Sequence, residues 1–323
     1  MIGSFVLTVD VEPDERLLDP ARRPEWNGFL DMLQEIGPLR ERLSRRTGRR
    51  VFFNWFLRMD HQIAEVYGNV AWAARHYRDV LAKLESEGDA IGLHHHAFRW
   101  CASNGRWVSD HEDEPWIERS VTNAVEGFLR QQGCRPRAFR FGDRWLSDRL
   151  VARLDRLGIR YDLTLEPGMR SASGMVPTES SRGLLPDSQT ALRRPYRPAR
   201  SNYREPGGVL RRRLWLIPVS TGCVNGPALP AQVRPEHDFV HLNLGLDPGW
   251  IRHILDGLLD AEEPIVVSVA RTGDLTLPGG RDRFLENLDF LCRHARVAER
   301  IFETAAAAIA RFRKHALRKK SEG

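Results

Sequence analysis

The stretch FVLTVDVE at residues 5–12 decides the fold class of this chain. An apolar, β-branched run ends abruptly in two acids, which is the pattern of a buried strand that delivers polar side chains at its carboxyl end. Seven later runs have a similar character. The eight predicted strands cover residues 5–10, 51–58, 90–94, 138–141, 160–164, 214–220, 239–244 and 265–270.

Helical patterns occupy the segments between most of these strands. Leu150, Leu154 and Leu157 recur at helical spacing, and Gly158 is placed to end that helix. Strand–helix alternation indicates an α/β fold with parallel strands and crossover helices. Eight strands favour a distorted (β/α) barrel of seven or eight parallel strands over an open sheet. In such barrels the chemistry gathers at the carboxyl ends of the strands.

One stretch interrupts the alternation. Residues 166–212 are rich in Gly, Pro, Ser and Arg and have no clear periodicity. A loop of this length inside a compact domain is usually functional or disordered, and this one follows the fifth strand, so we expect a substrate-side insertion over the catalytic face. We expect residues 1–297 to form one barrel domain, and residues 298–323 to form a C-terminal helix with a basic tail.

The charge of the chain first suggests a polyanionic partner. The 323 residues carry a formal net charge of +6, and of 49 basic residues only four are lysines, which leaves 45 arginines. Arginine spread along the whole chain is more typical of a genome-wide codon bias than of a nucleic-acid surface. The basic residues near the C-terminus continue an amphipathic helix. We therefore expect no nucleic-acid partner.

The remaining composition indicates an intracellular globular protein. Four cysteines form no C-x-x-C pair and are expected to be reduced thiols. The first residues lack a basic region and a cleavage site, so they do not resemble a signal peptide. No apolar run reaches membrane-spanning length. We expect a cytoplasmic protein without a membrane span.

Two pairs of side chains at strand ends predict a metal site. Asp10 and Glu12 are two residues apart and project to one side of the first strand, and His94 and His96 share a side at the end of the third. Two imidazoles with one or two carboxylates suit a divalent metal that keeps an open position. Each pair also has a plainer interpretation, as a solvated, capped loop or a solvated histidine run.

Other strand ends also carry polar groups. Singly, each is more typical of a salt bridge or a cap than of a catalyst. Together they predict a strongly polar barrel mouth, in which Asp60 and Asp143 would contact substrate. The set comprises Arg58, Asp60, Arg140, Asp143, His241, Asn243, Arg271 and Asp274.

With these motifs, the chain resembles the polysaccharide deacetylase superfamily, the group with the NodB homology domain (carbohydrate esterase family four). The similarity extends to about residue 295. Residues 8–12 resemble the first motif, with a catalytic base and a metal-binding acid, and residues 92–96 the second, with two metal-binding histidines. Residues 139–142 resemble the third, whose arginine orients the base. Residues 216–220 resemble the strand that follows the substrate loop.

The resemblance implies a metal-dependent hydrolase that removes an acyl group, an N-acetyl group in particular, from a saccharide or saccharide precursor. Asp10 would be the general base and would lie at the metal, with Arg140 holding it in place. Glu12, His94 and His96 would bind a divalent ion, zinc in our expectation.

The sequence departs from the family pattern at two positions. Phe98 stands where the second motif usually has its second histidine, and Arg271 stands where the last strand usually ends in the histidine that acts as general acid. Arg271 can stabilise an oxyanion but cannot donate a proton near neutral pH. His241 is a physical candidate for the acid. The alternative is a catalytically impaired, carbohydrate-binding relative of the same fold.

The 166–212 segment adds a prediction about the substrate. It contains several arginines with tyrosines between them, and we single out Arg197 and Tyr196 as substrate-binding residues. Arginine forks suit carboxylates and phosphates, so the saccharide would be anionic or nucleotide-linked. The plainer interpretation is an arginine-rich loop in an arginine-rich protein.

Overall fold

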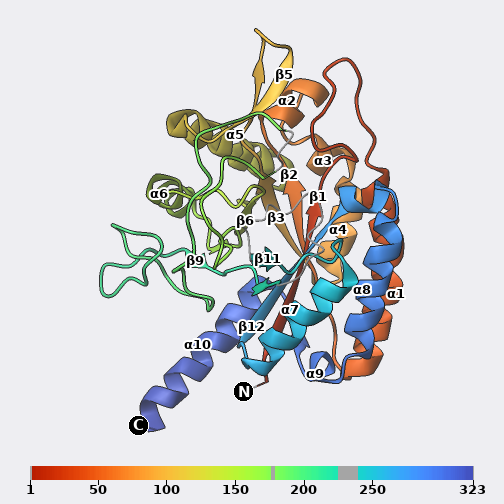
Figure 1. The fold of residues 1–323 in the computed structure, drawn as a ribbon, viewed down its shortest axis with the longest axis vertical. Coiled ribbons are helices and arrows are strands. Elements are labelled where there is room, and N and C mark those ends of the chain that lie inside the picture. The colour runs from red at the N-terminus through yellow and green to blue at the C-terminus, as the bar shows by residue number, and fades with distance from the viewer. Residues whose placement is uncertain (1, 176–178, 225–238, 323) are drawn as a thin grey trace.

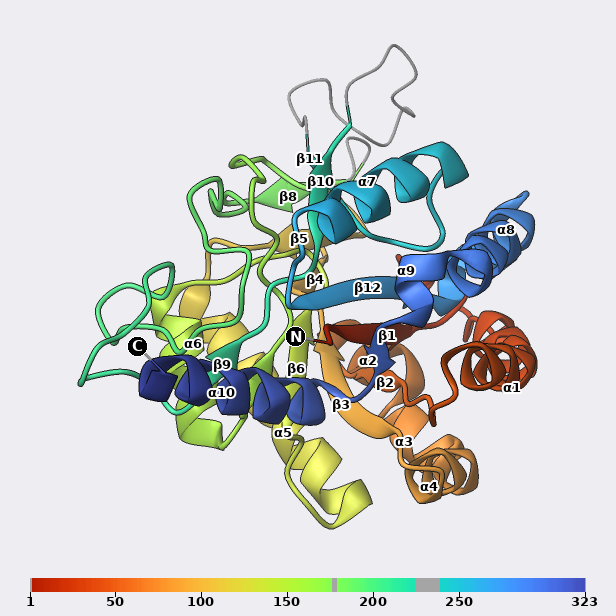
Figure 2. The ribbon, with the colours of Figure 1, turned by 90° about the horizontal axis from the view of Figure 1, so that it is seen from below.

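The computed structural model describes residues 2–175, 179–224 and 239–322. Its main sheet begins with β1 (Ser4–Val11), which is buried along its whole length. Seven parallel strands follow the order β12-β1-β2-β3-β6-β7-β9. The other six are β2 (Asn54–Arg58), β3 (Ala90–His95), β6 (Ala138–Phe141), β7 (Tyr161–Asp162), β9 (Trp215–Leu216) and β12 (Ile265–Arg271). The sheet is curled with helices outside it (Figure 2), so the predicted distorted (β/α) barrel is confirmed.

The barrel closes between β9 and β12 through short segments. The amide of Ser220 donates to the carbonyl of Val267 at 3.1 Å. The amide of Leu244 donates to the carbonyl of Val269 at 2.8 Å. The predicted strand at 239–244 is therefore only partly right. Its first half is β11 (Phe239–His241), whose backbone pairs antiparallel with β10 (Thr221–Cys223). The residues after His241 do not continue this pairing. Asn243 instead forms a single parallel bridge with Val269 of β12.

Helices pack outside the sheet, most of them on crossover connections (Figure 1). Gly158 adopts the left-handed conformation at φ 91° directly after α6, as the sequence predicts, and the side chain of Asp247 caps α7. The helices up to residue 298 are α1 (Asn27–Thr47), α2 (His61–Tyr67), α3 (Trp72–His76), α4 (Arg78–Ser86), α5 (Glu114–Gln132), α6 (Asp148–Leu157), α7 (Pro248–Asp260), the 3₁₀ turn η1 (Thr272–Thr276), α8 (Gly280–Arg293) and α9 (Ala295–Ala298).

The C-terminal segment begins differently from the prediction. The final helix does not start near residue 298, because Ile301 and Phe302 form a short strand, β13 (Ile301–Phe302), beside the start of β1. Helix α10 (Ala305–Glu322) follows, and Asn54 accepts a hydrogen bond from the amide of Ala305 at its start. It lies across the amino ends of the strands (Figure 2), where its apolar face packs against the core.

The 166–212 segment contributes to a small second sheet that the sequence did not indicate. Strand β8 (Ser181–Arg182) pairs with β5 (Arg106–Asp110), which forms a hairpin with β4 (Phe98–Cys101). The rest of the segment has no helix in its described part. The hairpin follows directly after β3 and projects beyond the carboxyl ends of the barrel strands (Figure 1). Those ends carry the polar residues.

Candidate metal centre and active site

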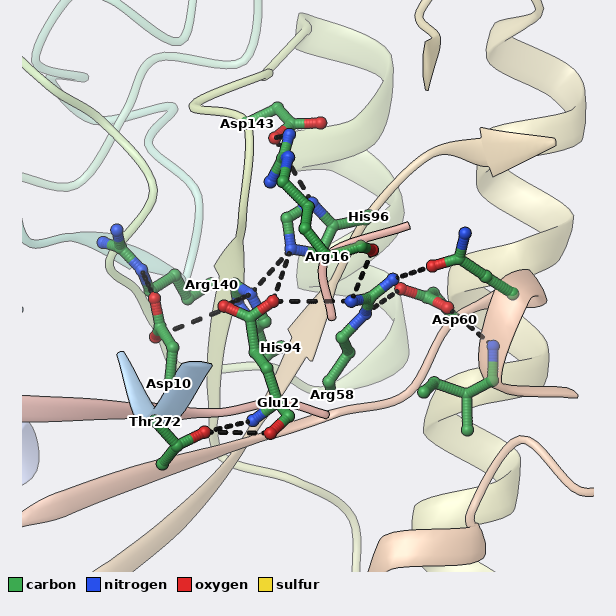
Figure 3. A network of polar contacts seen from close by, with 12 residues as sticks. Asp10, Glu12, Arg16, Arg58, Asp60, His94, His96, Arg140, Asp143 and Thr272 are labelled. Atoms are coloured by element: carbon green, nitrogen blue, oxygen red, sulfur yellow. Dashed lines mark hydrogen bonds and ion pairs between the residues drawn. The ribbon is translucent and has the colours of Figure 1, made fainter. Parts of the chain in front are cut away.

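The carboxyl ends of β1 and β3 bring three potential metal ligands together (Figure 3). His94 Nε2 lies 3.6 Å from one carboxylate oxygen of Glu12, and His96 Nε2 lies 3.4 Å from the other. The two Nε2 atoms are 3.0 Å apart. One ligand atom from each of the three residues falls within 4.8 Å of the others. All three side chains are buried.

Strand alternation explains why these residues meet. His94 and His96 face Glu12, while the ring of His95, between them, turns away and donates from Nδ1 to the carbonyl of Met59 at 2.8 Å. Burial lowers the pKa of His95 to about 4, so this imidazole is neutral in the folded chain. It belongs to the packing on the other side of the strand.

The donor set fits a divalent cation. Burial alone would raise the pKa of Glu12, but its contacts with His94 and His96 outweigh that effect and hold the pKa well below its ordinary value. A carboxylate and two imidazoles converging on one point are a usual ligand set for zinc and similar ions. Two imidazole nitrogens and a carboxylate packed this closely, away from water, are explained most simply by a shared cation.

Asp143 contacts the second ring nitrogen of His96, one of the three potential ligands. Its carboxylate lies 3.3 Å from Nδ1 of His96, and Arg16 pairs with the same carboxylate oxygen at 2.7 Å. Arg16, His96 and hydrogen bonds hold the pKa of the buried Asp143 well below its ordinary value. A histidine whose second nitrogen is held by a carboxylate is a common arrangement around protein metal sites. Asp143, which we expected to bind substrate, therefore supports His96.

Gly142, next to Asp143, leaves room for the same ring. A Cβ atom built at this position would lie 2.1 Å from Cε1 of His96. The other face of the imidazole stacks on Phe98 at 5.0 Å between ring centroids. Phe98, which stands in place of a histidine of the family motif, thus packs against a predicted ligand.

The carboxylate of Asp60 is also held by contacts within the protein. It is fully buried, receives Nε of Arg58 at 2.8 Å and caps α2 by accepting from the amide of Ile63. Arg58 also reaches a carboxylate oxygen of Glu12 at 3.5 Å. Asp60 was predicted to contact substrate. In the structure it forms an ion pair with Arg58, which lies beside Glu12 (Figure 3).

The backbone around Glu12 is tied to β12. The hydroxyl of Thr272 accepts from the amide of Glu12 at 2.8 Å and donates to its carbonyl at 2.9 Å. Two bonds from one side chain satisfy both polar groups of the residue that follows β1. They hold the end of this strand in register with the end of β12.

Asp10 lies beside the ligand cluster, paired with an arginine. Nε of Arg140 reaches Oδ2 of Asp10 at 2.9 Å, and Nη1 of Arg140 donates to the carbonyl of Leu163. The other oxygen, Oδ1, lies 3.9 Å from His94 Nδ1 and has no hydrogen-bond partner in the described chain. The geometry thus leaves one carboxylate oxygen available, next to the predicted metal.

Glu166 is a site residue that the sequence did not reveal. It opens the 166–212 segment just beyond β7, and Arg140 Nη2 lies 3.9 Å from its Oε1 atom. Its Oε2 atom lies 3.6 Å from Nδ1 of His241. No strand motif contains Glu166, so its only sequence signal was an acid shortly after a strand end.

Arg271 ends β12, next to Asp10 in the register with β1. Burial opposes its charge, but the carboxylates of Asp274, Glu12 and Asp10 raise its pKa above the ordinary value. Asn243 donates to Asp274 at 3.4 Å. Arg271 is therefore a permanent cation at the barrel mouth.

Two predicted substrate residues lie elsewhere. Tyr196 is buried, and its hydroxyl donates to the carbonyl of Tyr203. Arg197 donates to the carbonyl of Arg212 and lines a hollow with Asp155 and other arginines. Among the described residues, neither contacts the ligand cluster. Their bonds to main-chain carbonyls shape the loop itself.

A large hollow of about 1360 Å³ lies at the other end of the strands. It is lined by residues such as Ile2, Arg300 and Phe312 and contains none of the residues above. The chemistry-bearing side chains are gathered at the opposite end of the sheet. The candidate functional site is therefore at the carboxyl ends of the strands, away from this hollow.

Solved structures share this fold. PuuE allantoinase matches 94% of this chain and 88% of its own at 13% identity, with a TM-score of 0.50. Structures described as polysaccharide deacetylases match over similar lengths, each with a TM-score of 0.48: one from Mycobacterium smegmatis (16% identity, 98% of this chain and 91% of its own) and one from Pseudomonas aeruginosa PAO1 (13%, 94% and 89%). No family model and no curated protein matches the sequence.

These likenesses concern the fold. At 13% identity, the match to the allantoinase structure supports the barrel fold and nothing beyond it. The class defined by the fold and the site is thus a distorted (β/α) barrel with a Glu–His–His cluster at its mouth. In the described part of the chain no helix is long and apolar enough to cross a membrane.

Proposed function

We propose that the protein is a metal-dependent hydrolase that removes an N-acetyl or related acyl group from a saccharide or saccharide precursor. One observation carries this proposal: the buried convergence of Glu12, His94 and His96, with Asp10 and its partner Arg140 alongside. A carboxylate next to a metal position suits hydrolysis of an unactivated amide, because the metal would acidify the attacking water and the carboxylate can take its proton. The deacetylases among the similar structures support the choice of an acyl group on a sugar.

Glu12, His94 and His96 would hold the ion, zinc in our proposal. Such an ion supplies Lewis acidity that polarises a carbonyl and acidifies water. Asp10 accepts the proton of the attacking water at Oδ1, the oxygen that Arg140 leaves unoccupied. Arg140 holds the other oxygen and prevents the carboxylate from turning away.

Arg271 stabilises the oxyanion that forms when water adds to the carbonyl. Its raised pKa keeps it charged throughout, so it contributes electrostatic stabilisation and no proton. Its place beside Asp10 in the strand register puts this charge next to the base. The substrate would be a cytoplasmic saccharide, and the arginines of the 166–212 segment favour an anionic or nucleotide-linked one.

Metal analysis and acetate release test the proposal together. The purified protein should carry one equivalent of a divalent metal, lost in His94→Ala and His96→Ala. Release of acetate from N-acetylated sugars should disappear in Asp10→Asn while the metal largely remains. A protein that is well folded and metal-free after growth in zinc-supplemented medium would refute this function.

Arg271 favours one alternative, a carbohydrate-binding protein without catalysis. It occupies the place where the family's general acid is expected. Calorimetric sugar binding by a metal-loaded protein that releases no acetate would decide for this alternative. Acetate release that depends on Asp10 would exclude it.

A further inference from the structure

Glu166 and His241 form a buried pair across the barrel mouth from β3. Glu166 is 1% exposed and His241 is 7% exposed. Their closest polar atoms, Glu166 Oε2 and His241 Nδ1, are 3.6 Å apart. Within the described chain, Glu166 Oε2 and His241 Nε2 have no hydrogen-bond partner. A buried acid and a buried imidazole that face each other, each with a polar atom that has no hydrogen bond, are a costly arrangement for structure alone.

The charges around the pair determine where its proton resides. Arg140, Arg144, Arg271 and Asp10 surround both groups. Burial raises the pKa of Glu166 in spite of the three arginines. Burial, together with Arg271 and Arg140, holds the pKa of His241 well below its ordinary value. The imidazole is therefore neutral near neutral pH, and burial shifts Glu166 towards its protonated form.

We infer that Glu166 and His241 together supply the proton that the departing nitrogen needs, with His241 Nε2 as the donor to substrate and Glu166 as the donor to His241 Nδ1. This assignment rests on the proposed function. A neutral imidazole cannot give up its proton alone, because an imidazolate would remain. Delivery from Glu166 to Nδ1 at the same time keeps the ring neutral.

The step balances. Water adds to the acyl carbon and gives one proton to Asp10. The carbon–nitrogen bond then breaks, its electron pair goes to nitrogen, and nitrogen takes the Nε2 proton while Glu166 passes its proton to Nδ1. Glu166 is left as a carboxylate beside Arg140, Arg144 and Arg271, which stabilise it. To reset the pair, Nδ1 returns its proton to Glu166 and Nε2 takes one from solvent, while Asp10 releases its proton to solvent.

Neighbouring groups are unsuited to this task. Arg271 keeps its proton because its pKa is raised. His94 and His96 converge on the metal position, and Nε2 of His111 lies 3.7 Å from the carboxylate of Asp143. Both ring nitrogens of His111 also lack hydrogen-bond partners in the described chain, but the pKa of the adjacent Asp143 is held well below its ordinary value, so no protonated acid lies beside this histidine.

Leaving-group dependence tests the inference in the metal-loaded protein. An N-acetylated sugar needs a proton on its leaving nitrogen, whereas 4-nitrophenyl acetate has a leaving group that needs none. Glu166→Gln should lower kcat on the amide by about 10²–10⁴-fold and change aryl acetate hydrolysis only a few-fold. Glu205→Gln, an exposed change in the same loop, is the matched control and should alter neither rate.

Each other outcome overturns the assignment. Equal losses on both substrates in Glu166→Gln would show a structural role, and no loss on either would show no role. Wild-type protein that hydrolyses neither substrate would sink the proposed function itself. Infrared spectroscopy is independent of turnover: the carboxylic-acid C=O band at pH 7 should be weaker in Glu166→Gln than in wild type, with the contribution of Asp162 identified from Asp162→Asn. A band of unchanged intensity in Glu166→Gln would refute Glu166 as the proton store.

Discussion

Asp143 illustrates how the role of a single residue changes with its partners. As an acid at a strand end it was expected to contact substrate, but its carboxylate lies 3.3 Å from His96 Nδ1 and is held by Arg16. The contact between this carboxylate and Nδ1 helps to fix the orientation in which Nε2 faces Glu12. Partners also distinguish Asp10 from Asp60. Asp10 has one carboxylate oxygen without a hydrogen-bond partner in the described chain, whereas Asp60 pairs with Arg58 and caps a helix.

Replacing Asp143 with asparagine should weaken the metal site. An amide cannot match the charged carboxylate as acceptor for His96, and loss of such supporting groups typically weakens metal binding about 10–100-fold. Competitive chelator titration measures this change. Glu179→Gln removes the other carboxylate that pairs with Arg16, without touching His96, and should leave the affinity within a few-fold of wild type. Equal affinities in wild type and Asp143→Asn would contradict the supporting role.

At the scale of elements, the site depends on how strand ends are held together. β1 and β3 are separated by β2 in the sheet, yet they deliver all three ligands. Thr272 ties the end of β1 to β12, and Gly142 after β6 leaves space for His96. Because these contacts cross between elements, changes outside the ligand set should disturb it.

Gly142→Ala should abolish metal binding while the barrel still folds. The new methyl group would lie 2.1 Å from the His96 ring, so the ring must move off its position next to Glu12. Metal content after purification and far-ultraviolet circular dichroism measure the two effects. Full metal occupancy in this variant would show that His96 has another position from which it can bind.

Gly257→Ala is the contrasting glycine change. Gly257 lies inside α7, and an added Cβ would meet no atom within 4 Å. Alanine should stabilise the protein by about 0.5–1 kcal/mol because glycine loses more backbone entropy in a helix. Urea denaturation measures the difference, and metal content should stay at the wild-type value. A loss of stability would show that α7 needs glycine at this position.

At the scale of the whole molecule, burial of charge at the sheet has a cost in stability. Asp162 on β7 is fully buried, and burial raises its pKa to about 7 although Thr164 and Arg140 oppose the shift. In the unfolded chain the pKa of an aspartate is about 3.9. Folding therefore favours the protonated acid, and stability should fall as pH rises from about 4 to 7.

Asp162→Asn should remove this loss. Relative to wild type, the variant should gain stability at pH 8, by up to a few kcal/mol, and less at pH 5. Urea denaturation at the two pH values gives the difference, with the exposed Asp19→Asn as the control in which no such pH-dependent gain is expected. A gain that is the same at both pH values would mean that the ionisation of Asp162 is not its cause.

Local sequence patterns predicted a large part of the fold and the core of the site. Apolar runs located the strands, and alternation placed Asp10 with Glu12 and His94 with His96, because side-chain direction in a strand is a property of the local backbone. Strands as short as β7 and β9 were predicted as longer runs, since hydrogen-bond pairing, which apolar character does not report, sets where they end.

What the sequence by itself determined is the order of the strands along the chain, the side on which each strand-end group projects, and the clustering of acids and histidines at one end of the barrel. Only the tertiary structure decided which of those groups meet. Glu166 reaches His241, Arg16 reaches Asp143, and Tyr196 and Arg197 bond within their own loop. The physical reason is that these contacts join residues far apart in the chain, so they depend on how the loops return over the barrel and not on any local repeat.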